Sequence, residues 1–172
     1  MNYIGLNTCD TANDPGIRVS LFCSGCRVHC KGCFNPESWN FCAGKPFTEE
    51  TLETILKALD EPFVRGLSLL GGDPLEPENE PEILKIVEAV REKFGDTKDV
   101  WMWTGRVYGK VKDSPLVNAV DVLIDGPFVQ KLLTKEKNAW CGSTNQRIIP
   151  ISPAARSTMP SQLEAHEEHA AN

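Results

Sequence analysis

The stretch IRVSLFCSGCRVHCKGCFNP, residues 17–36, joins a strand-like run to a loop that is rich in cysteine. Residues 17–23 are mostly apolar and β-branched, which favours a buried strand. The spacing C-x2-C-x3-C-x2-C places the thiols at Cys23, Cys26, Cys30 and Cys33. Thiols so close in sequence are typical of a metal site, which is either a closed cage of four thiolates or a three-thiolate site with one open metal position.

Outward from this stretch, strand-like and helix-like segments alternate along the chain. Short apolar runs predict further strands at 66–72, 99–105 and 120–126. Apolar residues at helical spacing predict helices over 48–60, where Thr48 is a suitable N-cap, and over 80–95, which ends at Gly95. This alternation predicts an α/β fold with mostly parallel strands. Because a complete eight-fold barrel needs about 250 residues, we expect a partial, open β/α barrel.

Length and composition indicate one domain in a reducing compartment. The 172 residues are enough for a single hydrophobic core. We expect the domain to cover residues 1–154, because residues 155–172 have few large apolar side chains and are typical of a flexible tail. The N-terminus lacks the pattern of a secretory signal. Seven cysteines without such a signal favour a cytoplasmic metalloprotein.

Charge and hydropathy exclude two classes of ligand. The formal net charge is −6, and lysine and arginine form no dense cluster, which argues against nucleic acid and membrane surfaces as partners. No apolar run approaches the ~20 residues that a membrane-spanning helix requires.

Reasoning from the residues leaves the ligand set of the cysteine loop open. Structural zinc is one alternative, although zinc sites usually separate their two cysteine pairs by a dozen residues or more. A ferredoxin-type cluster is another, but its run of C-x2-C-x2-C-x3-C-P differs in spacing. Cys23 falls at the end of the predicted strand, where packing as a small apolar residue is expected. Without Cys23, the pattern is C-x3-C-x2-C.

That C-x3-C-x2-C loop, with GGDPL after the next predicted strand, resembles the radical S-adenosylmethionine superfamily. Within it the chain is similar to the activating enzymes of glycyl-radical enzymes, and most of all to those that act on anaerobic ribonucleoside-triphosphate reductase. The resemblance covers about residues 3 to 150. It is carried by the stretches NDPGIR (13–18), GCFNPESW (32–39), GKPFT (44–48), SLLGGDPL (68–75), VWMWTG (100–105), VDVLIDGPFVQ (120–130) and WCGSTNQRII (140–149).

The resemblance implies the chemistry of an oxidoreductase. Cys26, Cys30 and Cys33 would bind three irons of a [4Fe-4S] cluster, and the fourth iron would bind S-adenosylmethionine. Reductive cleavage of S-adenosylmethionine would give a 5'-deoxyadenosyl radical, which would abstract hydrogen from a glycine of the reductase. Reduced flavodoxin or ferredoxin would be the electron donor. A closed site of four cysteines could not act in this way, because no iron would be open to a ligand.

The resemblance also implies residues that contact S-adenosylmethionine. Gly32 and Phe34 would border the adenosyl group, although most of the superfamily has an aromatic residue at the position of Gly32. The GGDPL loop would bind the methionyl ammonium group, because glycine lets the backbone approach a ligand closely. The candidates in that loop are Gly71, Gly72 and Asp73. Thr104 and Asp125 follow later predicted strands, where barrels place ligand groups, but Asp125 is equally suited to a turn.

Other residues are expected to serve structure, and other functions stay open. Arg18 would form a surface salt bridge, and His29 would be solvated. Asp14 stands where the family has glycine. The thiols expected to be buried and free are Cys9, Cys42 and Cys141. The open alternatives are activation of another glycyl-radical enzyme such as pyruvate formate-lyase, radical chemistry on a small molecule, and a non-enzymatic zinc-binding module.

Overall fold

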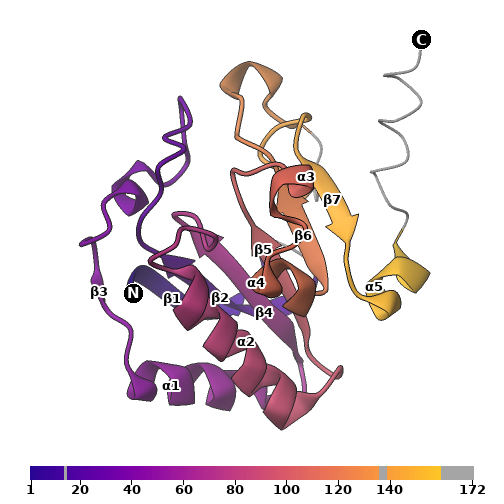
Figure 1. Ribbon diagram of the computed structural model, residues 1–172. Helices are drawn as coiled ribbons and strands as arrows, with labels where there is room; N and C mark the ends of the chain where they lie inside the picture. The colour runs from indigo at the N-terminus through magenta and orange to yellow at the C-terminus, as the bar shows by residue number, and fades with distance from the viewer. Residues whose placement is uncertain (14, 136–138, 160–172) are drawn as a thin grey trace.

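The chain forms an α/β fold around one sheet in the computed structural model, which describes residues 1–13, 15–135 and 139–159 (Figure 1). The strands are β1 (Asn2–Asp10), β2 (Ile17–Cys23), β3 (Lys45–Pro46), β4 (Val64–Gly71), β5 (Asp99–Trp103), β6 (Val122–Asp125) and β7 (Arg147–Pro150). The α-helices are α1 (Glu49–Leu59), α2 (Glu80–Phe94), α3 (Tyr108–Val111), α4 (Pro115–Ala119) and α5 (Pro153–Thr158). Short 3-10 helices are η1 (Pro36–Trp39) and η2 (Gln130–Leu132). In this part of the chain, no helix is both long enough and apolar enough to cross a membrane.

The sheet is mixed and open. Its strand order is β3-β1-β2-β4-β5-β6-β7. The neighbours from β2 through β4 and β5 to β6 are parallel, whereas β1 runs antiparallel to β2 and β3, and β7 runs antiparallel to β6. The expectation of a mostly parallel sheet was therefore wrong outside the central strands, and a partial barrel is not confirmed. β1 is antiparallel to β2 because the short connection between them allows only a hairpin-like return.

The two long helices and the central strands were predicted from the sequence pattern. The predicted helices over 48–60 and 80–95 are confirmed as α1 and α2, and the three later strands are β4, β5 and β6. The Thr48 hydroxyl accepts the backbone N–H of Thr51 as the N-cap of α1, and Gly95, with φ of 57°, ends α2. The elements that were not predicted are β1, β3, β7 and the short helices α3, α4 and α5. Asp14, at the family's glycine position, lies outside the described residues.

Alternating side chains of the strands pack on opposite faces of the sheet. Helices α1, α2 and α4 cover one face, where they bury residues such as Leu21, Leu69 and Ile86 in the main core (Figure 1). On the other face, a smaller cluster includes Trp101 and Ala155 of α5. The expected domain boundary after residue 154 falls inside α5, so the folded part continues beyond it. The rest of the expected tail, residues 160–172, lies outside the described residues.

Arg18 is buried rather than exposed. Its side chain is fully covered, and its guanidinium donates to the Ser68 hydroxyl (2.8 Å), to the Leu67 carbonyl (2.8 Å) and to the Asp99 carboxylate. The expectation of a surface salt bridge was therefore wrong. Arg18 lies near the amino end of β2, far along the strand from the cysteine loop, and it ties β2 to β4 and β5.

Candidate functional site

The carboxyl ends of the four parallel strands meet at one edge of the sheet, where a cavity of about 580 Å³ opens. Its wall comes from the cysteine loop after β2, the glycine turn after β4, and the segments after β5 and β6. The segments before β2 and before β7 complete the wall. A cavity of this size lies within the range of small-molecule and cofactor sites.

Three of the four loop cysteines line this cavity, namely Cys26, Cys30 and Cys33. Cys23 is the last residue of β2, is fully buried and belongs to the main core. The prediction that Cys23 packs as an apolar residue is confirmed. Burial, followed by the charge of Asp73, raises the pKa of the Cys23 thiol, so it is held in its neutral form.

The glycine turn after β4 packs against the cysteine loop through backbone atoms. Gly71 has φ of 104°, and a Cβ at this position would lie 2.4 Å from the carbonyl oxygen of Cys23. A Cβ at Gly72 would lie 2.3 Å from the carbonyl oxygen of Gly25. Side chains are therefore excluded at both positions, and the bare backbone of the turn forms part of the cavity wall.

The residues predicted around the adenosyl group do not all reach the cavity. Phe34 lines it, is 66% exposed, and packs against Phe128 with ring centroids 4.9 Å apart. Thr104 also lines the cavity. Gly32 is not part of the cavity wall, and a Cβ there would lie 2.7 Å from the side chain of Gln130.

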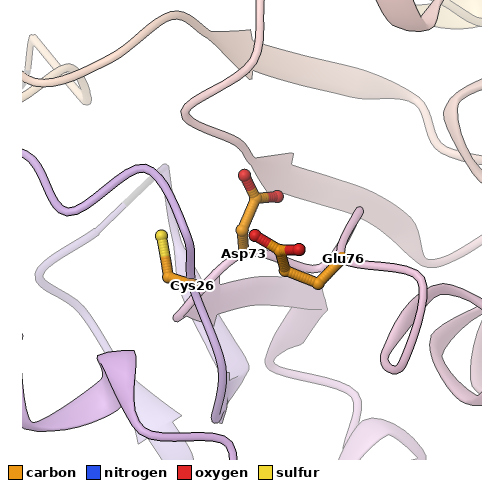
Figure 2. A group of neighbouring side chains, drawn as sticks. All are labelled: Cys26, Asp73 and Glu76. Atoms are coloured by element: carbon orange, nitrogen blue, oxygen red, sulfur yellow. The ribbon is translucent and has the colours of Figure 1, made fainter.

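Asp73, the acidic residue of GGDPL, is buried beside Glu76 and Cys26 (Figure 2). Potential ligand atoms of these three residues lie within 4.8 Å of one another. The Asp73 carboxylate accepts the Thr104 hydroxyl (2.9 Å to one oxygen and 3.1 Å to the other) and the backbone N–H of Leu75 (3.0 Å). Burial raises the pKa of Asp73. Because its oxygens already accept these donors, Asp73 supports the loops instead of facing the cavity.

Asp125 is also occupied by protein contacts. Its carboxylate accepts Arg147 Nε at 2.9 Å and the backbone N–H of Tyr108 at 2.6 Å. It is buried and is not part of the cavity wall. Of the two expectations for Asp125, these contacts favour the structural one, because Asp125 caps the start of α3 and pairs with Arg147 of β7.

Trp39 lines the cavity, but it was not among the predicted site residues. Its ring stacks on the imidazole of His29, with centroids 4.5 Å apart, and His29 is exposed as expected. Its Nε1–H is buried and has no hydrogen-bond partner among the described residues. The signal that could have found Trp39 is its place in the motif GCFNPESW.

Cys141 is a second residue of the wall that sequence reasoning missed. Burial, followed by the charge of Asp125, raises the pKa of Cys141 to about 11. It lies in the stretch WCGSTNQRII. This stretch contributed to the family resemblance, but it did not indicate that the Cys141 side chain lines the cavity. All seven cysteines are free, but Cys9 and Cys42 are exposed and Cys141 is partly buried, so the expectation of buried thiols was wrong for Cys9 and Cys42 and holds only in part for Cys141.

These residues fit a [4Fe-4S] cluster. Three thiols of one loop face a common cavity, and thiolates are the usual ligands of such clusters. The backbone N–H of Asn35 donates to Cys33 Sγ at 3.4 Å, as is typical of protein sulfur ligands of iron. The unpaired indole N–H of Trp39 adds a buried donor in the same wall, which suits a sulfur acceptor.

Comparison with known families defines the class of protein. Residues 12–149 match the family model described as a 4Fe-4S single cluster domain. This range includes the whole cysteine loop and every segment that contributes to the cavity wall. The fold and site are thus those of a protein with a single [4Fe-4S] cluster domain.

Curated relatives identify the particular family, and each is named anaerobic ribonucleoside-triphosphate reductase-activating protein. The relative in Enterobacteria phage T4 is 42% identical over 148 residues, which cover 86% of this chain and 93% of the relative. The relative in Escherichia coli (strain K12) is 40% identical over 151 residues, which cover 85% of this chain and 96% of the relative. The relative in Vibrio cholerae serotype O1 is 40% identical over 152 residues, which cover 86% of this chain and 97% of the relative. The chain therefore belongs to the family of anaerobic ribonucleoside-triphosphate reductase-activating proteins.

Proposed function

We propose that this chain activates an anaerobic ribonucleoside-triphosphate reductase by generating a glycyl radical on it. The names of the relatives support the partner, and the match to a 4Fe-4S single cluster domain supports the cofactor. One observation carries the proposal: Cys26, Cys30 and Cys33 line a cavity, whereas Cys23 is withdrawn into the core. Three thiolate ligands would leave one iron of a bound cluster open to another ligand.

The bound cluster would supply the electron that reductively cleaves S-adenosylmethionine, and the resulting 5'-deoxyadenosyl radical would abstract the α-hydrogen of a glycine in the reductase. The chain's own residues bind and orient these groups. Cys26, Cys30 and Cys33 hold the cluster. The Gly71–Gly72 turn offers bare backbone to the methionyl end, and Phe34 offers an exposed apolar ring to the adenosyl end. Asp73, which lies behind the wall, accepts the hydroxyl of Thr104 and so keeps this wall residue in place.

The substrate in this proposal is a peptide loop of the reductase, which reaches the cavity at the open edge of the sheet. A reduced flavodoxin or ferredoxin supplies the electron. The seven free thiols support a reducing compartment, which we propose is the cytoplasm.

Electron paramagnetic resonance tests the proposal directly. The reconstituted protein is incubated anaerobically with an anaerobic ribonucleoside-triphosphate reductase, S-adenosylmethionine and reductant. We expect a glycyl-radical doublet that requires every component and is absent when Cys30→Ala replaces the wild type. The control is a reductase on which its own activating protein generates the glycyl radical. If this chain gives no doublet with that reductase, the proposed partner is contradicted. Stoichiometric zinc, without iron and sulfide after reconstitution, would favour the zinc-binding module instead.

A further inference from the structure

The segment that follows β4, residues 72–79, holds the start of the cysteine loop at several points. The backbone N–H of Asp73 donates to the carbonyl oxygen of Gly25 at 2.8 Å. The side-chain amide of Asn79 donates to the carbonyl oxygen of Ser24 at 2.9 Å. These bonds restrain the main chain immediately before Cys26.

Glu76 continues this hold on the other side of Cys26. Its side chain is 1% exposed, and its Oε1 accepts the backbone N–H of Arg27 at 2.8 Å. Its Oε2 accepts Arg27 Nη1 at 2.7 Å and lies 3.2 Å from Arg106 Nη2. Because Arg27 directly follows Cys26, the main chain is held on both sides of this cysteine.

The Glu76 carboxylate is buried between the Cys26 sulfur and two guanidinium groups. A ligand oxygen of Glu76 lies within 4.8 Å of the Cys26 sulfur, and a carboxylate so close to a thiolate ligand repels it (Figure 2). Burying the carboxylate also costs free energy, which the guanidinium groups of Arg27 and Arg106 offset. The bond to the Arg27 N–H is charge-assisted and so roughly twice as strong as a bond to a neutral acceptor.

We propose that Glu76 is a positioning residue for Cys26. By accepting the N–H of Arg27, it presets the main chain so that the Cys26 thiol already faces the cavity before a cluster binds. That Cys26 binds an iron–sulfur cluster rests on the proposed function. The hold on the main chain is a property of the chain without a cluster.

Glu78 provides a matched control. It is 49% exposed and binds the same guanidinium, accepting Arg27 Nη1 at 2.8 Å, without a bond to the Arg27 main chain. Glu76→Gln and Glu78→Gln therefore remove equal charge from the same arginine and preserve side-chain shape. Arg27→Gln removes the guanidinium and keeps the hydrogen bond from the main-chain N–H of residue 27 to Glu76. Glu76→Asp keeps the charge but withdraws the carboxylate, and serves as a second test variant if Glu76→Gln does not fold.

The first measurement is hydrogen exchange of the main-chain amide of residue 27, relative to its intrinsic exchange rate, in the protein without cluster. We expect exchange about tenfold faster in Glu76→Gln and Glu76→Asp, and within about twofold of wild type in Glu78→Gln and Arg27→Gln. The second measurement is the rate at which the reconstituted proteins release iron to a chelator. We expect faster release from the two Glu76 variants than from Glu78→Gln and Arg27→Gln. The electron paramagnetic resonance spectrum of the reduced cluster, which reports ligand geometry, should change in Glu76→Gln and not in Glu78→Gln.

Equal exchange at Arg27 in Glu76→Gln and wild type would overturn the inference. Equal acceleration in Glu76→Gln and Arg27→Gln would also overturn it, because the effect would then come from the ion pair alone. Failure of the wild type to bind iron and sulfide would overturn the proposed function instead, while the exchange comparison still decides whether Glu76 holds the loop.

Discussion

At the scale of single residues, environment separates four thiols that look alike in sequence. Cys23 is enclosed by the core, and the side-chain amide of Asn79 lies 3.8 Å from its sulfur. Cys26, Cys30 and Cys33 face the cavity. A metal ligand must be both reachable and deprotonated, and the burial of Cys23 disfavours both conditions.

Alanine variants of the four loop cysteines test this division. If the proposed function is right, Cys26→Ala, Cys30→Ala and Cys33→Ala should each abolish S-adenosylmethionine cleavage, because each would remove a proposed cluster ligand. Cys23→Ala should retain most of the cleavage and lose about 1 kcal/mol of stability, because it removes one buried sulfur atom. Chromatography of released 5'-deoxyadenosine, together with iron content per chain, measures the outcome. Equal loss in all four variants would mean that the ligand set is wrong.

At the scale of elements, an ion pair joins β6 and β7 beside the cavity. Asp125 and Arg147 face each other in the register of β6 and β7, and Asp125 also accepts the N–H of Tyr108 at the start of α3. The guanidinium of Arg147 has a raised pKa because of its hydrogen bond to Asp125. This pair joins three elements whose connecting segments form part of the site.

Removing Asp125 should destabilise the fold. Asp125→Ala leaves the partly buried Arg147 without its carboxylate, so unfolding in urea should show a loss of about 3–5 kcal/mol. The double variant with Arg147→Ala should lose less than the sum of the single variants, because both changes break one interaction. Calorimetry of the folded Asp125→Ala protein should find S-adenosylmethionine affinity within about twofold of wild type. A large loss of affinity at unchanged stability would instead support the ribose-binding role.

At the scale of the whole molecule, the fully and partly buried thiols link stability to pH. Burial raises the pKa of Cys23, Cys26, Cys30 and Cys141 above the ordinary value of 9.0. Between the ordinary value and the raised one, the unfolded chain has released protons that the folded chain still holds. The folded state without cluster is therefore fully stabilised below about pH 9 and loses this stabilisation as the pH rises through the raised values.

Urea unfolding of the reduced protein without cluster, at pH values from about 8 to about 10.5, measures this effect. We expect stability to fall as pH rises above 9.0, with Cys23 contributing up to about 1.4 kcal/mol per pH unit. Cys23→Ala should reduce the slope by about that amount. Identical slopes in the variant and the wild type would contradict the raised pKa of Cys23.

Elements with a strong local pattern could be predicted, and those formed by distant pairing could not. Helices α1 and α2 follow from apolar residues at helical spacing with a cap at Thr48 and a stop at Gly95. β1 is half exposed and lacks a continuous apolar run, so its strand conformation depends on pairing with β2 and β3. α5 is short, and Ala155 is buried only because the Trp101 side of the sheet lies beneath it.

The amino-acid sequence alone determined which segments form the central strands and the two long helices, where the thiols lie along the chain, and that glycines follow β4. These features depend on local periodicity and backbone freedom. The tertiary structure alone decided which side chains face the cavity. It turned Asp73 and Asp125 toward protein donors, and it brought Trp39 and Cys141 into the wall. Burial and hydrogen bonding are set by contacts between segments far apart in the chain, which local patterns do not contain.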